Sequence, residues 1–361
     1  MRVGIIGGSI AGCATAALLH RAGHDVIVFE RSESDLVSRG AGIATPTAVW
    51  QDMMAHGLID AALPACRADY FRFVTRGSGT GQQRWLGDVQ MSFTLLNWAH
   101  LYQGFRRCVP DDLYRRASTV ELVEARPQGT TLHLRPGGSL DFDLVVCADG
   151  YRSMGRRLID PGATPRYRGM VLWRGLLHES DIGVDALDGC NGQRVVYQGG
   201  HGIAYYIPGS GQSTERGKRL LMWGYYLQVP ESALASVLVD DQERQRSSSV
   251  PFGKVHPEVK AAFESRLADL FPPFAGSGVL RAVANATSLV DALAAAPAVD
   301  DGLCRWGEAQ VQVAAQVMPV AERIERSAVF DMPDLTTMPT AATNDWMSAA
   351  YAGLAVTLPS V

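Results

Sequence analysis

The sequence has no excess of charge of one sign and no block of basic residues. Its 33 lysines and arginines face 37 aspartates and glutamates. Nucleic acids and anionic membrane surfaces are usually bound through clustered basic side chains, so neither is expected as a partner. No apolar run reaches the roughly 20 residues that cross a bilayer. These absences favour a small molecule as the partner.

Paired cysteines and metal-binding motifs are also missing. The six cysteines lie far apart with no C-x-x-C pair, which argues against a disulfide framework, a zinc site and a dithiol centre. We expect them to be small buried side chains of a cytoplasmic protein in a reducing compartment. None of the eight histidines has H-E-x-x-H spacing, so no metal is expected. The cysteines are Cys13, Cys66, Cys108, Cys147, Cys190 and Cys304.

What is present is enough apolar material for one large or two ordinary domains, since 47% of the 361 residues are hydrophobic. The apolar stretch from Val3 to Leu19 follows a basic residue and superficially resembles a secretory signal. Gly7, Gly8 and Ser9 interrupt that stretch, and another apolar segment follows it directly. We therefore expect the stretch to be part of the folded protein.

The first thirty residues have the pattern of a strand, helix and strand that bind a dinucleotide. Residues 2–6 form a short apolar run typical of a parallel strand. Apolar residues then recur with helical spacing from Ile10 onward. The second strand, 25–30, ends in Glu30, which lies 18 positions after Gly12. That spacing is close to the roughly 20 residues of the ribose-binding carboxylate in dinucleotide-binding units.

Ser9 occupies the middle glycine position of the fingerprint G-x-G-x-x-G. Gly7 permits the tight turn and Gly12 lets the helix pack closely, whereas a serine adds only a small Cβ. Its hydroxyl can donate to a phosphate oxygen beside the free N–H groups of the helix start. The pattern predicts NAD or FAD, because Glu30 would repel the 2′-phosphate of NADP. A glycine turn without a cofactor is the alternative.

Several further stretches carry a resemblance to a known family. Together with "GIIGGSIAG" (4–12) and "VFERS" (28–32), these stretches resemble the single-component flavin-dependent aromatic hydroxylases of the p-hydroxybenzoate hydroxylase type. Among them, the Trp-Arg and Tyr-Ile-Pro stretches point to the hydroxypyridine branch of that family. The resemblance covers nearly the whole chain. The stretches are "RGAGI" (39–43), "ADGYRSMGRR" (148–157), "GMVLWRGLL" (169–177), "HGIAYYIPG" (201–209) and "RWGEAQ" (305–310).

The resemblance implies a mixed α/β (α+β) fold: a Rossmann-like FAD-binding domain with an inserted antiparallel-sheet substrate domain and a C-terminal helix. The helix around 304–328 contains Pro319, which we expect to kink or interrupt it. The FAD-binding domain is expected at 1–70, 95–165 and 276–330, the substrate domain at 71–94 and 166–275, and an extended tail at 331–361.

The implied activity is hydroxylation of an electron-rich aromatic or N-heteroaromatic ring, phenol-like or hydroxypyridine-like. It uses O₂ and NADH or NADPH through a flavin hydroperoxide, which water would decompose, so a nearly apolar site fits. The alternatives are an NAD-dependent dehydrogenase that uses only the N-terminal unit and a non-catalytic flavin-binding relative. The choice of nicotinamide, the substrate ring and a homodimeric state stay open.

The resemblance also assigns roles to residues of the cofactor site. Glu30 would hold the adenosine ribose, and Arg31 would lie near the adenine. Asp149 would serve both the flavin and the nicotinamide, while Gly42 belongs to a loop that passes close to the cofactor. Tyr102 would replace in part an arginine of many relatives, where this chain has Trp98. The pyrophosphate would be held by Gly7, Gly8, Ser9, Ile10 and Ala11.

The substrate side is less well defined by the sequence. Candidate pocket residues are Trp173, Tyr205, Trp223 and Tyr225, although filling of a core between sheet and helix is the more common role of such aromatic residues. His201 and Tyr206 are weak candidates for a base that deprotonates a ring hydroxyl.

One motif of the family is missing. Relatives carry a Gly-Asp pair before the turn at the flavin ring, and Gly87-Asp88 comes too early to be that pair. The ring-proximal turn would be formed by Gly276 and Gly278, directly after "FPPF". Either part of the flavin site is lost, or the sequence omits a stretch between about 274 and 276, which we favour because lost strands would expose sheet edges.

Overall fold

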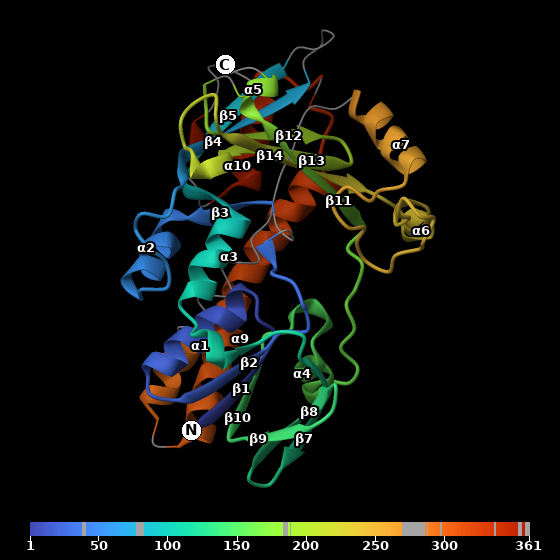
Figure 1. The fold of residues 1–361 in the computed structure, drawn as a ribbon. Helices are drawn as coiled ribbons and strands as arrows, with labels where there is room; N and C mark the ends of the chain where they lie inside the picture. Colours follow the sequence, from blue (N-terminus) through green and yellow to red (C-terminus); the bar gives the residue numbers. More distant parts are fainter. Residues whose placement is uncertain are drawn as a thin grey trace.

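The computed structural model describes residues 1–37, 41–76, 83–182, 187, 189–268, 286, 288–296, 298–335, 337–352 and 356–357. Two parts, each centred on a sheet, lie one above the other in Figure 1, with the N-terminus in the lower part. The long helix α9 (Val299–Glu325) runs from the lower part into the upper one.

The lower part is a parallel sheet of the dinucleotide-binding type. Its strand order is β10-β1-β2-β6, and every neighbouring pair is parallel. Its strands are apolar because helices pack on one side and a small antiparallel sheet, β7-β8-β9, packs on the other. The elements are β1 (Arg2–Ile6), α1 (Ile10–Arg21), β2 (Asp25–Phe29), α3 (Trp98–Arg107), β6 (Tyr114–Arg115), β7 (Thr119–Arg126), β8 (Gly129–Arg135), β9 (Ser139–Phe142), β10 (Leu144–Cys147) and α4 (Met154–Ile159).

The upper part is an eight-stranded sheet with the order β11-β14-β13-β12-β4-β5-β15, in which β3 also pairs with β5. All its pairs are antiparallel except β12 with β4. Its strands are β3 (Gly42–Pro46), β4 (Cys66–Arg76), β5 (Gln83–Asn97), β11 (Met170–His178), β12 (Gly192–Tyr197), β13 (Gly200–Ile207), β14 (Leu220–Gln228) and β15 (Val356–Thr357).

The two faces of this sheet have different coverings. On the inner face, side chains such as Ile203 and Tyr205 pack with Met332, Leu335 and helix α10 (Thr340–Ala350). On the outer face, Phe263 of α7 (Pro257–Ala268) packs on aromatic residues of β11 and β14. Side chains alternate between the faces along each strand, so neighbours in sequence contribute to different surfaces. The remaining helices are α2 (Thr47–Ala55), α5 (Glu179–Ile182) and α6 (Leu234–Val237).

The expected strands and the first helix are present, while the C-terminal third differs from expectation. Helix α9 continues through Pro319. Proline leaves the carbonyl four residues earlier without its bond, and Ala315 is exposed, so water can bond that carbonyl. The expected extended tail is wrong, because 340–350 form α10. Its buried Thr343, Met347 and Ala350 recur at helical spacing.

Three further expectations concern the domain bounds, the burial of the cysteines and the missing Gly-Asp motif. Strand β3 and the start of β4 belong to the upper sheet, although they lie inside the range 1–70 expected for the cofactor domain. Cys13, Cys66 and Cys190 are buried, but Cys304 is exposed on α9, so uniform burial of the cysteines is wrong. Gly276, Gly278 and the site of the missing Gly-Asp pair lie outside the described residues.

No helix in the described part of the chain is long and apolar enough to cross a membrane.

Candidate cofactor and substrate site

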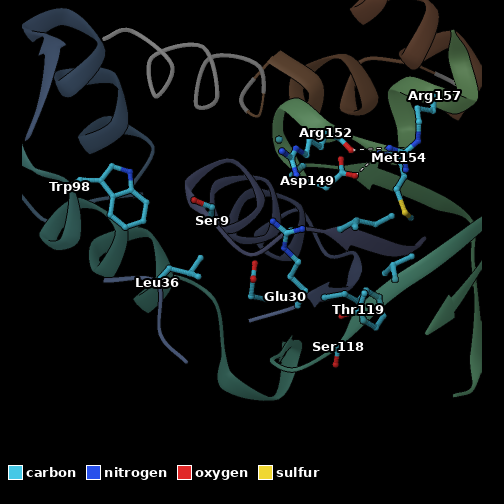
Figure 2. Close-up of a pocket in the computed structure, with 17 residues that line it drawn as sticks. Ser9, Glu30, Leu36, Trp98, Ser118, Thr119, Asp149, Arg152, Met154 and Arg157 are labelled. Atoms are coloured by element: carbon cyan, nitrogen blue, oxygen red, sulfur yellow. Dashed lines mark hydrogen bonds between the residues drawn. The ribbon is translucent and has the colours of Figure 1, made fainter. Parts of the chain in front are cut away.

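A cleft of about 510 Å³ opens where β1, β2 and β10 end. Ile6 and Phe29 end two of these strands, and Ala148 follows the third. Open α/β sheets bind ligands outside the carboxyl ends of their strands, so the cleft lies where such a ligand is expected. Figure 2 shows Ser9, Glu30 and Asp149 around one space, with Trp98 on one side and Arg152 on the other.

The turn between β1 and α1 is closed to side chains at its glycines. Gly7 has φ +100°, and a Cβ there would lie 2.4 Å from the Ala148 carbonyl oxygen. A Cβ on Gly12 would lie 1.8 Å from the Gly7 carbonyl oxygen. A Cβ on Gly8 would lie 2.1 Å from the Tyr114 hydroxyl oxygen. These contacts explain why glycine is needed at each of these positions.

Ser9 differs from these glycines because its backbone is extended, with φ −82°, and tolerates a side chain. It lies at the N-cap of α1, yet its side chain makes no capping hydrogen bond. It lines the cleft beside the first N–H groups of the helix, including those of Ile10 and Ala11, which have no partners within α1. The hydroxyl and these N–H groups together form a donor set suited to an anion.

Tyr114 is a residue that the sequence did not reveal. From the short strand β6, its hydroxyl donates to the Gly8 carbonyl oxygen at 2.8 Å, and the Arg106 guanidinium lies 4.1 Å from its ring centroid. Burial raises the pKa of Tyr114, so the hydroxyl stays protonated and holds the turn. No local pattern marks this contact, because it joins residues 106 positions apart.

Glu30 is buried at the end of β2, with 6% of its surface exposed. Its carboxylate accepts the Gly8 N–H at 2.9 Å and the Ser32 N–H at 2.8 Å. Each carboxylate oxygen keeps further lone pairs for hydroxyl donors. The side chain faces the cleft in Figure 2, as a ribose-binding carboxylate would.

Asp149 follows β10 and begins the turn into α4. Its Oδ2 accepts the Met154 N–H at 2.7 Å, drawn as a dashed line in Figure 2. Within the described part of the chain its Oδ1 is buried and has no hydrogen-bond partner. A buried carboxylate oxygen without a donor is unfavourable by about 1–3 kcal/mol, so a donor on a bound group would stabilise this turn.

These observations fit an adenine dinucleotide. One cleft is lined by four features that such a ligand needs. They are the glycine turn without room for a Cβ, the donors at Ser9, the fixed carboxylate of Glu30 and the unpartnered Oδ1 of Asp149. Exposed Arg31 lines the same cleft.

Two predicted cofactor residues lie elsewhere. Tyr102 is 1% exposed and stacks behind Trp98, with ring centroids 5.3 Å apart. Trp98 lines the cleft and Tyr102 does not, so direct contact by Tyr102 is not supported. Gly42 packs against the inner face of the upper sheet, where a Cβ would lie 2.6 Å from the Met222 Cγ.

Strand alternation separates the four aromatic pocket candidates. Trp173, Trp223 and Tyr225 lie on the outer face, and Trp173 stacks on Phe263 with centroids 4.0 Å apart. They fill the core under α7, so the pocket expectation is wrong for all three. Tyr205 alone points to the inner face.

His201 and Tyr206 lack the properties of a catalytic base. Burial, aided by the Arg194 charge, lowers the pKa of His201 to about 3, so its imidazole is a weak base at neutral pH. Tyr206 lies on the outer face, with the Arg219 guanidinium 3.9 Å from its ring centroid. That arginine is bound in turn by the buried Glu179. No group of three or more potential metal ligands occurs among the described residues.

Comparisons with known proteins agree with this geometry. Residues 5–35 match the NAD(P)-binding Rossmann-like domain family, and residues 167–283 match the FAD binding domain-like family. The chain is 27% identical over 297 residues to 2,6-dihydroxypyridine 3-monooxygenase of Paenarthrobacter nicotinovorans, covering 79% of this chain and 72% of that protein. It is 33% identical over 192 residues to 3-amino-4-hydroxybenzoate 2-monooxygenase of Streptomyces cremeus, covering 50% and 48%.

Solved structures share the fold. The 2,6-dihydroxypyridine-3-hydroxylase of Arthrobacter nicotinovorans superposes with a TM-score of 0.81 at 21% identity, covering 100% of this chain and 98% of that one. Klebsiella pneumoniae HpxO, solved with FAD and uric acid, superposes with a TM-score of 0.65 at 18% identity, covering 96% and 92%. The cleft and the turn agree with these comparisons, in which the chain resembles FAD-dependent aromatic monooxygenases in sequence and shares their fold.

Proposed function

We propose that this protein hydroxylates an electron-rich aromatic or N-heteroaromatic ring, using O₂ and a reduced nicotinamide. The observation that carries the proposal is the convergence of the Gly7–Ser9 turn, Glu30 and Asp149 on one cleft of dinucleotide type. The names of the relatives, which act on dihydroxypyridine and amino-hydroxybenzoate rings, support the substrate class. When bound and reduced, FAD supplies the activation of O₂ and the transfer of one oxygen atom to the ring.

The role of the chain's own residues is then to bind the cofactor and the substrate ring and to orient them. The Ser9 hydroxyl and the first N–H groups of α1 would hold the diphosphate of FAD, and Glu30 would accept hydrogen bonds from its adenosine ribose. The buried Oδ1 of Asp149, which has no partner among the described residues, would accept a hydrogen bond from the bound group. Apolar side chains of the inner face of the upper sheet, such as Ile203 and Met222, would limit the access of water to the reacting ring. The unpaired state of the six cysteines supports a cytoplasmic location.

Visible absorbance and turnover test the proposal. The purified protein is expected to be yellow, and addition of a hydroxylated ring should raise the consumption of NADH or NADPH and of O₂. The product should be one oxygen atom heavier by mass spectrometry. A colourless protein that reduces NAD without O₂ would instead be a dehydrogenase. Colour with no response to any ring would indicate a flavin-binding protein without catalysis.

Substitution of Glu30 tests the cofactor assignment. Glu30→Ala removes a charged acceptor and leaves two backbone N–H groups without their partner, so FAD affinity should fall at least about 10-fold, and stability by about 1–3 kcal/mol. FAD titration of the apoprotein and thermal unfolding measure the two effects. The exposed Glu121 on β7 provides the control, because Glu121→Ala should change neither. Unchanged FAD affinity in Glu30→Ala would contradict the assignment.

A further inference from the structure

A second cavity lies on the outer face of the upper sheet, separate from the cofactor cleft. Its volume is about 100 Å³, and it shares no described lining residue with that cleft. A cavity of about 150 Å³ holds a benzene ring, so this one is too small for an aromatic substrate and has room for about three waters. The side chains that give it its polar character belong to Asn191, Tyr206, Arg216 and Arg219.

Glu179 fixes Arg219 beside this outer-face cavity. Glu179, at the start of α5, is fully buried, and its carboxylate accepts Arg219 Nε at 2.9 Å and Nη2 at 2.5 Å. It also accepts the backbone N–H groups of Gly217 at 2.8 Å and of Arg219 at 3.3 Å. These bonds use the roughly four lone-pair sites of a carboxylate. Glu179 does not line the cavity, so it holds the arginine from behind.

Arg219 and Asn191 keep donors that no protein group uses. A guanidinium has five N–H groups, and Arg219 gives two to Glu179 and one, from Nη1, to Asn191 Oδ1 at 3.1 Å. Asn191 Nδ2 donates one of its two hydrogens to the Arg67 carbonyl oxygen at 2.7 Å. Two N–H groups of Arg219 and one of Asn191 therefore have no acceptor in the described part of the chain.

Tyr206 adds a hydroxyl donor to the same cavity. Its side chain lies under the Arg219 guanidinium and is 2% exposed, and its hydroxyl is buried without a hydrogen-bond partner among the described residues. Burial raises the pKa of Tyr206, so the hydroxyl keeps its proton at neutral pH. A buried hydroxyl without a partner is unfavourable. An acceptor inside the cavity would remove that cost.

The excess of donors favours a ligand that only accepts hydrogen bonds. None of the described residues that line the cavity is acidic, and two of them are arginines, which stay charged at neutral pH. Glu179 offsets the charge of Arg219, so the attraction comes as much from aligned N–H and O–H groups as from net charge. The oxygens of phosphate, sulfate and carboxylate groups accept several such bonds at once. Water, in contrast, must also donate.

We propose that the outer-face cavity binds a small oxyanion such as inorganic phosphate, sulfate or a carboxylate group. Tyr206, Asn191 and Arg219 donate to its oxygens, and Arg216 adds positive charge. The bound ion joins residues 190–191 to the end of β13 and to the residues before β14, so it stabilises the upper part. This inference goes beyond the proposed function, because the cavity is separate from the cofactor cleft.

Thermal unfolding in the presence of oxyanions provides the test. Protein saturated with FAD is titrated with sodium phosphate, so that the donors at Ser9 are already occupied. Sodium sulfate and sodium acetate replace phosphate in parallel titrations, and sodium chloride at equal ionic strength is the reference. At least one oxyanion should raise the melting temperature by about 2 °C or more over chloride. The oxyanion with the lowest half-saturating concentration identifies the preferred group.

Adjacent tyrosines on β13 provide a matched pair of variants. Tyr205 and Tyr206 are both buried with unpartnered hydroxyls within the described chain, but they face opposite sides of the sheet. Tyr206→Phe should raise the half-saturating concentration of the preferred oxyanion about 3- to 10-fold, and Tyr205→Phe should leave it unchanged. Each variant loses one oxygen that bonds no protein group, so both should fold.

Two results would overturn the proposal. If no oxyanion exceeds chloride in its effect on the wild-type protein, the cavity holds water alone. If the preferred oxyanion has the same half-saturating concentration in wild type and Tyr206→Phe, the ion binds elsewhere on the protein. Neither result bears on ring hydroxylation. A protein that fails to bind FAD would contradict the proposed function, and the two tyrosine variants would still report on this cavity.

Discussion

At the scale of single residues, the turn before α1 combines positions that require glycine with one that does not. Backbone and side-chain atoms leave no space for a Cβ at Gly7, Gly8 or Gly12. At Ser9 the backbone is extended and the hydroxyl lines the cleft without capping the helix. The departure from the fingerprint therefore places a hydroxyl, which could donate to a phosphate, at the position that tolerates a side chain.

Substitutions of Ser9 separate the two roles of its side chain. Ser9→Ala keeps the Cβ and loses the hydroxyl, so its FAD affinity should fall about 3- to 10-fold. Ser9→Gly loses the same donor but allows the backbone to approach the diphosphate more closely, so its FAD affinity should fall less. Fluorescence titration of the apoprotein with FAD measures both. Equal affinity in wild type and Ser9→Ala would show that the hydroxyl does not reach the diphosphate.

The pH dependence of stability tests the environment of His201. Folded His201 takes a proton only near a pKa of about 3, whereas its usual value is 6.5. Between these values the unfolded chain binds more protons, so stability falls as the pH falls from 7 to 5, by about 2 kcal/mol from this residue. In urea unfolding, the free energy of unfolding of His201→Gln should fall by about 2 kcal/mol less than that of the wild type between pH 7 and 5. The same loss in both proteins would contradict deep burial of the imidazole.

At the scale of elements, a loop of the upper part contacts the cofactor cleft. Asp240 accepts backbone N–H groups of Gln242 and Arg244 and binds the guanidinium groups of Arg244 and Arg246. The loop so ordered continues to Ser247 and Ser248, which bond Arg152 at 2.6 and 2.9 Å, and Ser248 bonds the Tyr151 hydroxyl at 2.7 Å. Arg152 lines the cleft, so this loop supports its wall.

Loss of the Asp240 carboxylate should release this loop. Burial raises the pKa of Asp240, but its N–H and guanidinium partners outweigh burial and hold it well below the usual value, so it is ionised at neutral pH. Asp240→Ala should accelerate hydrogen exchange over 238–256 without affecting α1. Asp241→Ala, which removes a partly exposed pair with Lys254, should have little effect. Equal exchange in both variants would contradict this role.

At the scale of the whole molecule, the C-terminal helix completes the inner core of the upper sheet. Met347, Ala350 and Tyr351 are each at most 3% exposed. Arg84 of β5 bonds the Met338 carbonyl oxygen and the Thr343 hydroxyl at 2.8 and 3.0 Å. The chain thus returns at its end to cover strands formed near its beginning, as Figure 1 shows for α10 and β4.

Removal of that helix should destabilise the entire upper part. Burial of a large apolar side chain contributes about 1.5–3 kcal/mol, and whole domains are stable by only about 5–15 kcal/mol. A chain ending at Met338 should therefore be insoluble or melt at least about 10 °C lower. A chain ending at Ala352 keeps α10 and serves as the control. Similar melting temperatures for both chains would show that α10 is dispensable.

Local sequence patterns predict several parts of this structure. Spacing and turn chemistry predict the strand, glycine turn and helix of residues 2–21. They also predict the carboxylate at the end of β2 and the Asp149 turn after β10. The stripe of Thr343, Met347 and Ala350 also has helical spacing, so the local pattern contains helix α10, where an extended tail was expected.

Which groups come into contact depends on how distant segments pack together. Alternation along β13 and β14 predicts that Tyr205 and Tyr206 face opposite ways, but only strand pairing and the positions of α7 and α10 decide which face is inner. The contact of Tyr114 with Gly8 and the pairing of Arg219 with Glu179 join distant segments. Burial, too, is a property of the assembled chain, so the pKa of His201 could not be inferred before its neighbours were in place.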